Sequence, residues 1–222
     1  MTDCVIVAYG RSPIAKATKG SLAQVHPVDF GAEVLAGVLA RLPQLDPTEI
    51  DDLMVGCAIP EATMGLNPAR HIALRAGLPF EVAGQTVNRF CASGLQTIAS
   101  GAAMIGAGMA DVIVAGGVEH MSTPVLSDDP AYQDAYLLAN TDAYISMGMT
   151  AEHVAQRYGI TRVDMEQMAV DSNARAAAAR EQGVFADQIV PVTAVGPDGQ
   201  PFTLAHDECI RPGTNLEGLA GL

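Results

Sequence analysis

The chain has 222 residues, of which 49% are hydrophobic and 17% charged, so it can form a substantial core and is not an intrinsically disordered chain. Its 12 basic and 25 acidic side chains give a formal charge of −13, without a basic stripe that could bind a phosphate backbone. We expect one large domain or a domain and a half, and no nucleic-acid partner.

The first half of the sequence alternates strand-like and helix-like segments. The hydrophobic pattern predicts strands over 4–9, 52–59, 84–90 and 111–115, and helices over 28–42, 67–76 and 92–109. Such alternation is typical of an α/β fold with a mostly parallel sheet and helices on both faces. The segment 92–109 is small and apolar all round, which predicts a helix enclosed between two layers.

The pattern changes after Met121, where prolines and acidic residues interrupt both periods. We therefore expect a boundary that divides the chain into domains over 1–121 and 122–222. Helices are predicted over 151–158, with Thr150 as N-cap, and over 162–182, with Thr161 as N-cap and Gly183 beyond the end. A hairpin is predicted from 188–195 and 201–205 around Gly196-Pro197-Asp198-Gly199.

Two features of the sequence bear on its location. The uncharged run 90–110 is long enough to span a bilayer, but its serines, threonine and glycines favour a buried helix of a soluble protein. The first residues show no secretory signal pattern. We expect a cytoplasmic protein without a membrane span.

The clearest chemical signal is the segment 87–94, where a predicted strand turns directly into a helix at Cys91. A thiol in this position meets the positive end of the helix dipole, which favours the thiolate, and the sharp turn would expose the sulfur. The arrangement is similar to the nucleophile elbow of acyl-transfer enzymes. The alternative that the residues leave open is a buried cysteine at a strand end.

The remaining cysteines, Cys4, Cys57 and Cys209, are predicted to be structural: a core residue, a strand end and a loop residue, all free thiols without metal-ligand spacing. A nucleophilic cysteine also needs a base. Among the five histidines, His120 is the best candidate because it follows a predicted parallel strand, and a surface loop histidine is the alternative. The preceding Gly116-Gly117 predicts a tight chain reversal.

The two segments Asn88-Arg89-Phe90-Cys91-Ala92-Ser93-Gly94-Leu95-Gln96 and Ala115-Gly116-Gly117-Val118-Glu119-His120-Met121-Ser122 together resemble the thiolases. Further family-like segments are Arg11-Ser12-Pro13-Ile14, Met147-Gly148-Met149-Thr150-Ala151-Glu152 and Asp207-Glu208-Cys209-Ile210-Arg211-Pro212-Gly213-Thr214. The resemblance covers essentially the whole chain in order. It implies the N-terminal half of a layered thiolase fold, with an inserted α+β loop domain.

The resemblance implies an acyltransferase that converts a 3-ketoacyl-CoA and CoA into acetyl-CoA and a shortened acyl-CoA. Cys91 would carry the acyl group as a thioester. Met147 would line the acyl or pantetheine channel and Arg211 would lie near the CoA phosphate or adenine, while Leu138 and Gly218 would also contact CoA. Core positions are the alternatives for Met147 and Leu138, and many relatives have serine at the position of Gly218. CoA and acyl-CoA are substrates, and no bound cofactor or metal is implied.

The family also uses groups that this sequence lacks: the histidine of a Gly-His-Pro motif, a second cysteine in Cys-x-Gly-Gly-Gly, and a returning strand of the first domain. We therefore expect little activity from the chain alone, an exposed sheet edge, and a homodimer, a higher oligomer or a second chain with the C-terminal domain. One alternative is a non-catalytic module that binds CoA and dimerises. Another is a thioesterase or acyl carrier that uses Cys91 alone or with His120.

Overall fold

The computed structural model describes residues 3–123 and 130–221, which form two compact units. The first unit combines Met1–Val125 with Asp187–Cys209, and the second combines Leu126–Ala186 with Ile210–Leu222. The expected boundary after residue 121 lies close to the end of the first segment. Residues 187–209, however, were expected in the second domain and belong to the first unit.

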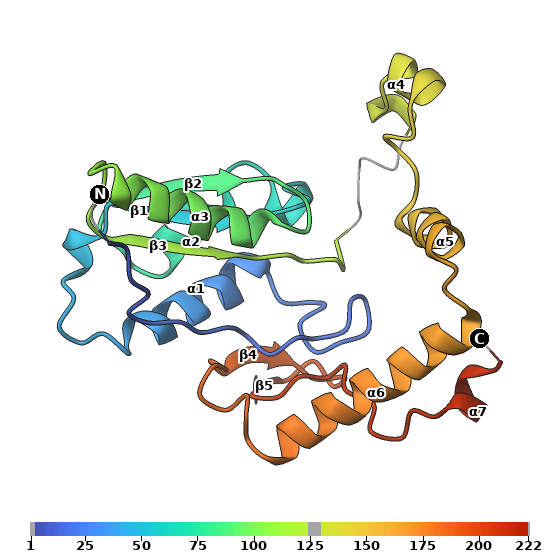
Figure 1. The fold of residues 1–222 in the computed structure, drawn as a ribbon. Coiled ribbons are helices and arrows are strands. Elements are labelled where there is room, and N and C mark those ends of the chain that lie inside the picture. Colours follow the sequence, from blue (N-terminus) through green and yellow to red (C-terminus); the bar gives the residue numbers. More distant parts are fainter. Residues whose placement is uncertain (1–2, 124–129, 222) are drawn as a thin grey trace. The chain divides into compact units, whose positions relative to one another are not determined.

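A parallel sheet forms the centre of the first unit (Figure 1). Strands β1 (Asp52–Gly56), β2 (Ala83–Val87) and β3 (Ile113–Gly117) have the order β2-β1-β3, and Gly56 lies opposite both Val87 and Gly117. Helix α2 (Pro68–Arg75) packs on one face with α1 (Pro27–Leu39) beside it, and α3 (Ser93–Gly106) packs on the other face. The α/β prediction is confirmed.

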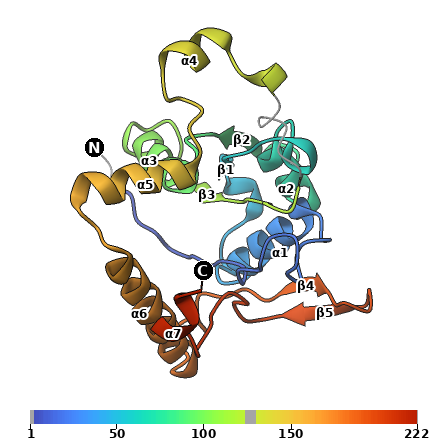
Figure 2. The same ribbon diagram turned by 90° about the vertical axis from the view of Figure 1, so that its right-hand side faces the viewer.

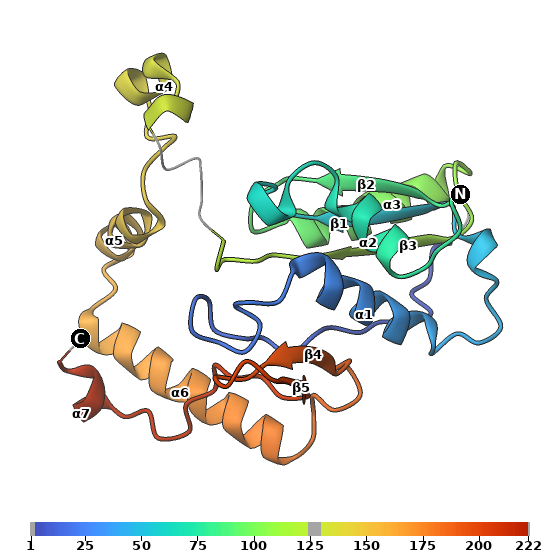
Figure 3. The ribbon, with the colours of Figure 1, turned by 180° about the vertical axis from the view of Figure 1, so that it is seen from behind.

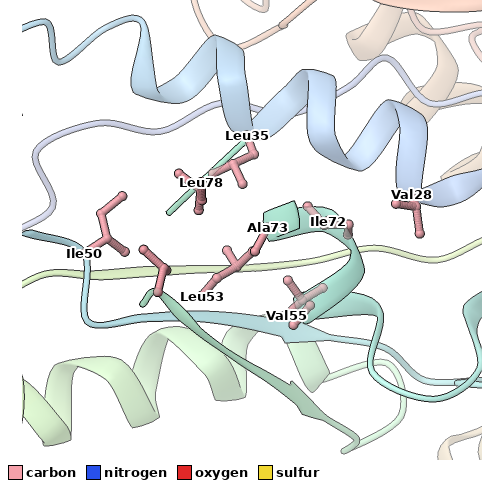
Figure 4. Close-up of a cluster of buried hydrophobic side chains, with 10 residues drawn as sticks. Val28, Leu35, Ile50, Leu53, Val55, Ile72, Ala73 and Leu78 are labelled. Atoms are coloured by element: carbon pink, nitrogen blue, oxygen red, sulfur yellow. The ribbon is translucent and has the colours of Figure 1, made fainter. Parts of the chain in front are cut away.

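The main core lies between β1, α2 and α1 (Figure 4). Four of the five residues of β1 are buried, as expected for a central strand that is covered on both faces. The buried side chains include Val28 and Leu35 of α1, Leu53 and Val55 of β1, and Ile72 of α2. The 3-10 helices η1 (Pro47–Glu49) and η2 (Ala62–Met64) connect these elements.

The prediction that α3 is enclosed between two layers is wrong for the described residues. Its buried residues are Ser93, Thr97 and Gly101, which repeat at helical spacing and so define a single face. Leu95, between these positions, is 71% exposed. The helix therefore presents a second apolar face to the surroundings.

The predicted strand over 4–9 is also absent. The segment forms no strand, Cys4 is exposed rather than buried, and Val5, Ile6 and Val7 are at least 70% exposed. A strand persists through hydrogen bonds to a neighbouring strand, and within the described residues 4–9 has no such neighbour, while β3 pairs with β1 alone. The apolar pattern is that of a strand, but the described residues provide no strand that pairs with it.

The predicted hairpin is present as β4 (Val192–Val195) and β5 (Pro201–Leu204), paired antiparallel. In its turn, Gly199 adopts a φ of 76°, which glycine tolerates without a steric cost. Figure 3 shows α1 between the sheet and this hairpin. Val190 fits against Gly37 of α1, where an added Cβ would lie 2.4 Å from the Cγ1 of Val190. This packing explains why 187–209 joins the first unit.

The second unit is helical, with η4 (Pro130–Tyr132), α4 (Ala135–Asn140), α5 (Met147–Tyr158), α6 (Arg162–Glu181) and α7 (Leu216–Leu219). Helix α6 has the predicted Thr161 cap. Helix α5 begins a turn earlier than predicted, because Ser146 caps the N–H of Met149 and Thr150 lies inside the helix. Helices α6 and α7 are in contact (Figure 2), and Arg162 Nη2 donates to the carbonyl oxygen of Leu219 at 3.1 Å.

Candidate active site

Cys91 lies in the turn between β2 and α3, at the carboxyl end of a parallel strand, and it is exposed. The structure therefore does not support the alternative of a buried cysteine. The preceding residue, Phe90, has a φ of 47°. A positive φ at a bulky residue is strongly disfavoured and costs on the order of 1–3 kcal/mol. The chain thus adopts a strained conformation immediately before Cys91.

The beginning of α3 sits directly on the ends of β1 and β3. A Cβ on Gly56 would lie 2.3 Å from the carbonyl carbon of Ser93, and a Cβ on Gly117 would lie 3.2 Å from the Cα of Gly94. The Gly116-Gly117 pair is therefore not the predicted chain reversal. The pair ends strand β3, and the absence of a side chain at Gly117 lets α3 approach closely.

Thr97 fixes the same contact through a buried hydroxyl. Its Oγ1 lies 2.8 Å from the carbonyl oxygens of both Gly94 and Gly116, so it bridges α3 to β3. At the N-terminus of α3, the N-cap residue Ala92 provides no side-chain hydrogen bond to the first turn. The positive end of the α3 dipole is therefore not compensated by a cap beside Cys91.

His120, the best candidate among the histidines, does not form a dyad with Cys91. Its Nδ1 lies 2.8 Å from Thr123 Oγ1 and its Nε2 lies 3.2 Å from the carbonyl oxygen of Leu22, so both ring nitrogens are engaged. The ring also packs near Phe30. In this conformation His120 stabilises the loop after β3 and has no nitrogen available to accept a proton from Cys91.

Cys57 follows β1 and is fully buried, as expected for a structural strand-end cysteine. Burial, and then the negative charge of Glu119, raise the pKa of the Cys57 thiol to about 11. Glu119 accepts the N–H of Ala58 at 2.7 Å and that of Ile59 at 3.3 Å. Glu119 therefore ties the loop after β3 to the loop after β1, a role that the sequence pattern does not reveal.

The four residues expected to contact CoA all belong to the second unit. Leu138 in α4 is 49% exposed and Met147, the first residue of α5, is 70% exposed, so the alternative of core positions is wrong for both. Arg211 is held through its backbone N–H by Asn173 Oδ1 of α6 at 2.9 Å. The N–H of Gly218 in α7 is accepted by Asn215 Oδ1 at 2.8 Å.

The family-like segment 207–214 divides between the two units. Asp207 forms a bidentate pair with Arg11, with oxygen–nitrogen distances of 2.8 and 2.9 Å. Glu208 accepts hydrogen bonds from the hydroxyl and the backbone N–H of Ser21. These two acidic residues hold the N-terminal loop, so only the part from Ile210 onward lies in the unit that contains Arg211.

Two further features concern the described residues only. They contain no group of three or more histidine, cysteine or acidic side chains arranged to hold a metal ion. Among the described helices, none combines the length and the apolar character needed to cross a membrane.

Comparison with known proteins identifies the family. The model of the thiolase N-terminal domain matches residues 4–222. A 3-ketoacyl-CoA thiolase of Bacillus subtilis is 44% identical over 231 residues, covering 100% of this chain and 59% of that protein. One from Saccharophagus degradans is 41% identical, covering 99% of this chain and 56% of that protein.

The crystal structure of the Bacillus anthracis acetyl-CoA acetyltransferase superposes with a TM-score of 0.86 at 36% identity, covering 100% of this chain and 58% of that chain. The chain therefore spans little more than half the length of the relatives that it matches. The match over residues 4–222 and the shared fold show that the chain belongs to the thiolase family, as an N-terminal thiolase domain.

Proposed function

We propose that the chain is the acyl-carrying portion of a 3-ketoacyl-CoA thiolase of the degradative type. The sulfur of Cys91 bonds to the C3 carbonyl carbon of the substrate, the C2–C3 bond breaks, and C2 takes up a proton to leave as acetyl-CoA. The resulting thioester is then attacked by the thiol of CoA, which releases the shortened acyl-CoA and restores Cys91. The observation that supports this role is the exposed Cys91 between β2 and α3.

His120 is not available as a base in the described structure, since both of its ring nitrogens are engaged. We infer that residues corresponding to the unmatched part of the relatives supply the Gly-His-Pro histidine and the Cys-x-Gly-Gly-Gly cysteine, in the same polypeptide or in a partner chain. Removing catalytic groups that act as a unit costs several orders of magnitude in rate. Residues 1–222 alone would then turn over very slowly.

The second unit would bind CoA. Arg211 is exposed and its guanidinium has no salt-bridge partner within the described residues, so it is available for a phosphate. The exposed side chains of Met147 and Leu138 offer apolar surface for the pantetheine or acyl portion. Gly218 would allow close approach of the ligand to the α7 backbone. The reaction requires CoA and acyl-CoA as substrates and no bound cofactor.

The two edges of the sheet in the first unit are open, which supports a partner at each edge. Strand β2 is an edge strand, and Phe90 and Leu95 nearby are 74% and 71% exposed, so we infer that a second copy of the chain covers this edge. At the other edge, β3 and the unpaired segment 4–9 would receive a strand from the rest of a thiolase. The four free thiols favour a cytoplasmic location.

A non-catalytic module that binds CoA and dimerises is the second candidate, and the engaged state of His120 favours it over a Cys91–His120 thioesterase. Thiolysis of acetoacetyl-CoA distinguishes the two. The purified chain is mixed with a polypeptide that carries the two missing motifs, and Cys91→Ala is the control. We expect turnover that the Cys91→Ala variant abolishes. A mixture that binds CoA by calorimetry but stays inactive would support the module instead.

A further inference from the structure

The turn that presents Cys91 is closed by the side chain of Ser93. Its Oγ accepts the backbone N–H of Arg89 at 2.9 Å and donates to the carbonyl oxygen of Phe90 at 2.5 Å. Ser93 is only 3% exposed, so water cannot readily replace these bonds. One buried hydroxyl therefore links the two residues before Cys91 to the first residue of α3.

Asn88 closes the same turn from the strand side. Its Oδ1 accepts the N–H of Phe90 at 2.8 Å, and its Nδ2 donates to the carbonyl oxygen of Ala58 at 3.1 Å. Asn88 and Ser93 thus satisfy both the N–H and the carbonyl oxygen of Phe90. That residue is the one with a φ of 47°, a conformation that a phenylalanine does not adopt without compensation.

We propose that Ser93 and Asn88 are positioning residues that form a clasp around Phe90, and that this clasp sets Cys91 at the positive end of α3. The inference rests on the proposed role of Cys91 as nucleophile. Without the clasp, Phe90 relaxes to a negative φ, and Cys91 leaves its exposed position before the uncapped first turn of the helix. The thiol then reacts more slowly with electrophiles.

The test is the rate of carboxamidomethylation of each cysteine by iodoacetamide at pH 7, followed by peptide mass spectrometry on the full chain. Cys209 is an exposed thiol of the same molecule and serves as the internal reference, and buried Cys57 reports unfolding. We expect Ser93→Ala to lower the Cys91 rate relative to Cys209 by roughly two- to fivefold. Asn88→Ala should lower it in the same direction.

Rescue separates this role from a general loss of stability. Glycine adopts a positive φ without cost, so Phe90→Gly removes the need for the clasp. The Ser93→Ala/Phe90→Gly double variant should regain the original Cys91 rate. Ser100→Ala, a matched change on the same helix whose hydroxyl accepts only from the side chain of Gln96 among the described contacts, should leave it unchanged.

An unchanged or faster Cys91 rate in Ser93→Ala would overturn the proposal, and so would a slow rate that Phe90→Gly does not restore. If Ser93→Ala exposes Cys57 to labelling, the double variant decides: restored protection of Cys57 and a restored Cys91 rate support the clasp, and any other result overturns it. Labelling needs no turnover. Failure of thiolysis would therefore overturn the proposed function and leave this result standing.

Discussion

Cys57 and Cys91 follow neighbouring parallel strands of one sheet, yet their surroundings are opposite. Cys57, after β1, is fully buried beside Glu119, and both effects oppose ionisation. Cys91, after β2, is exposed and precedes a helix that has no side-chain cap. A position at the carboxyl end of a parallel strand is therefore not enough to make a nucleophile. Exposure and the local charge decide which thiol can react.

The largest expected effect is the difference in labelling between these two thiols. At pH 8 a thiol with a pKa of about 11 is ionised in roughly one molecule in a thousand, and burial hinders access further. We expect iodoacetamide to label Cys91 at least about a hundredfold faster than Cys57 in the folded chain. In denaturant the two rates should converge. Similar rates in the folded chain would contradict the contrast between the two sites.

The second prediction concerns Gly56, which precedes Cys57 on β1 and faces the start of α3 beyond Cys91. Gly56→Ala would place a Cβ 2.3 Å from the Ser93 carbonyl carbon and 2.5 Å from the Gly94 nitrogen, both backbone atoms. Displacing α3 should cost about 3 kcal/mol in the free energy of unfolding, measured by urea denaturation. Gly116→Ala is the matched control, since an added Cβ there has no neighbour within 4 Å. Equal stability of both variants would show that α3 does not rest on Gly56.

The third prediction uses pH to isolate Cys57. Below pH 9 the thiol keeps its proton in both the folded and the unfolded chain, so its contribution to stability is fully present. Because the folded pKa is raised from 9.0 to about 11, the unfolded chain loses this proton first, and stability falls between pH 9 and 11. The Tm should fall over this interval, and fall less in Cys57→Ala. Parallel curves for the two proteins would rule out the raised pKa.

The smallest expected effect concerns Asp51 and Asp52 at the start of β1, whose pKa values are shifted in opposite directions. Burial raises the pKa of Asp52, whose Oδ1 is buried without a hydrogen-bond partner in the described structure, whereas the N–H groups of Val112 and Asp111 lower the pKa of Asp51. At pH 7, Asp52→Asn should raise the Tm by about 1–3 °C, because it removes a poorly solvated charge. Asp51→Asn should lower it. Shifts of the same sign would show that burial does not distinguish these neighbours.

Local sequence patterns predicted the elements that depend on local interactions. The Thr161 cap and the glycine beyond residue 182 define α6 closely, and the Gly196–Gly199 turn defines the hairpin. The prediction of a strand over 4–9 was wrong, although the segment has the apolar pattern of a strand. A strand also requires a neighbouring strand, which the local pattern does not reveal. Propensity describes the segment, whereas pairing depends on residues distant in sequence.

In the candidate site, too, local features could be predicted and contacts between distant residues could not. The motif around Cys91 was evident because a cysteine between a strand and a helix has a local signature. The contributions of Ser93, Asn88 and Glu119 were missed, since each acts through backbone groups that only the folded chain brings close. A serine two residues after the cysteine, and an asparagine before a residue that adopts a positive φ, are the signals that could have indicated the clasp.

The most direct test of the central claim is to trap the acyl group. The chain, combined with a polypeptide that carries the missing thiolase motifs, is mixed with acetoacetyl-CoA, quenched in acid, digested and analysed by mass spectrometry. We expect one acetyl group on the peptide that contains Cys91, and none in Cys91→Ala. An acetyl group on another cysteine, or undiminished turnover by Cys91→Ala, would contradict the assignment of Cys91 as the acyl carrier.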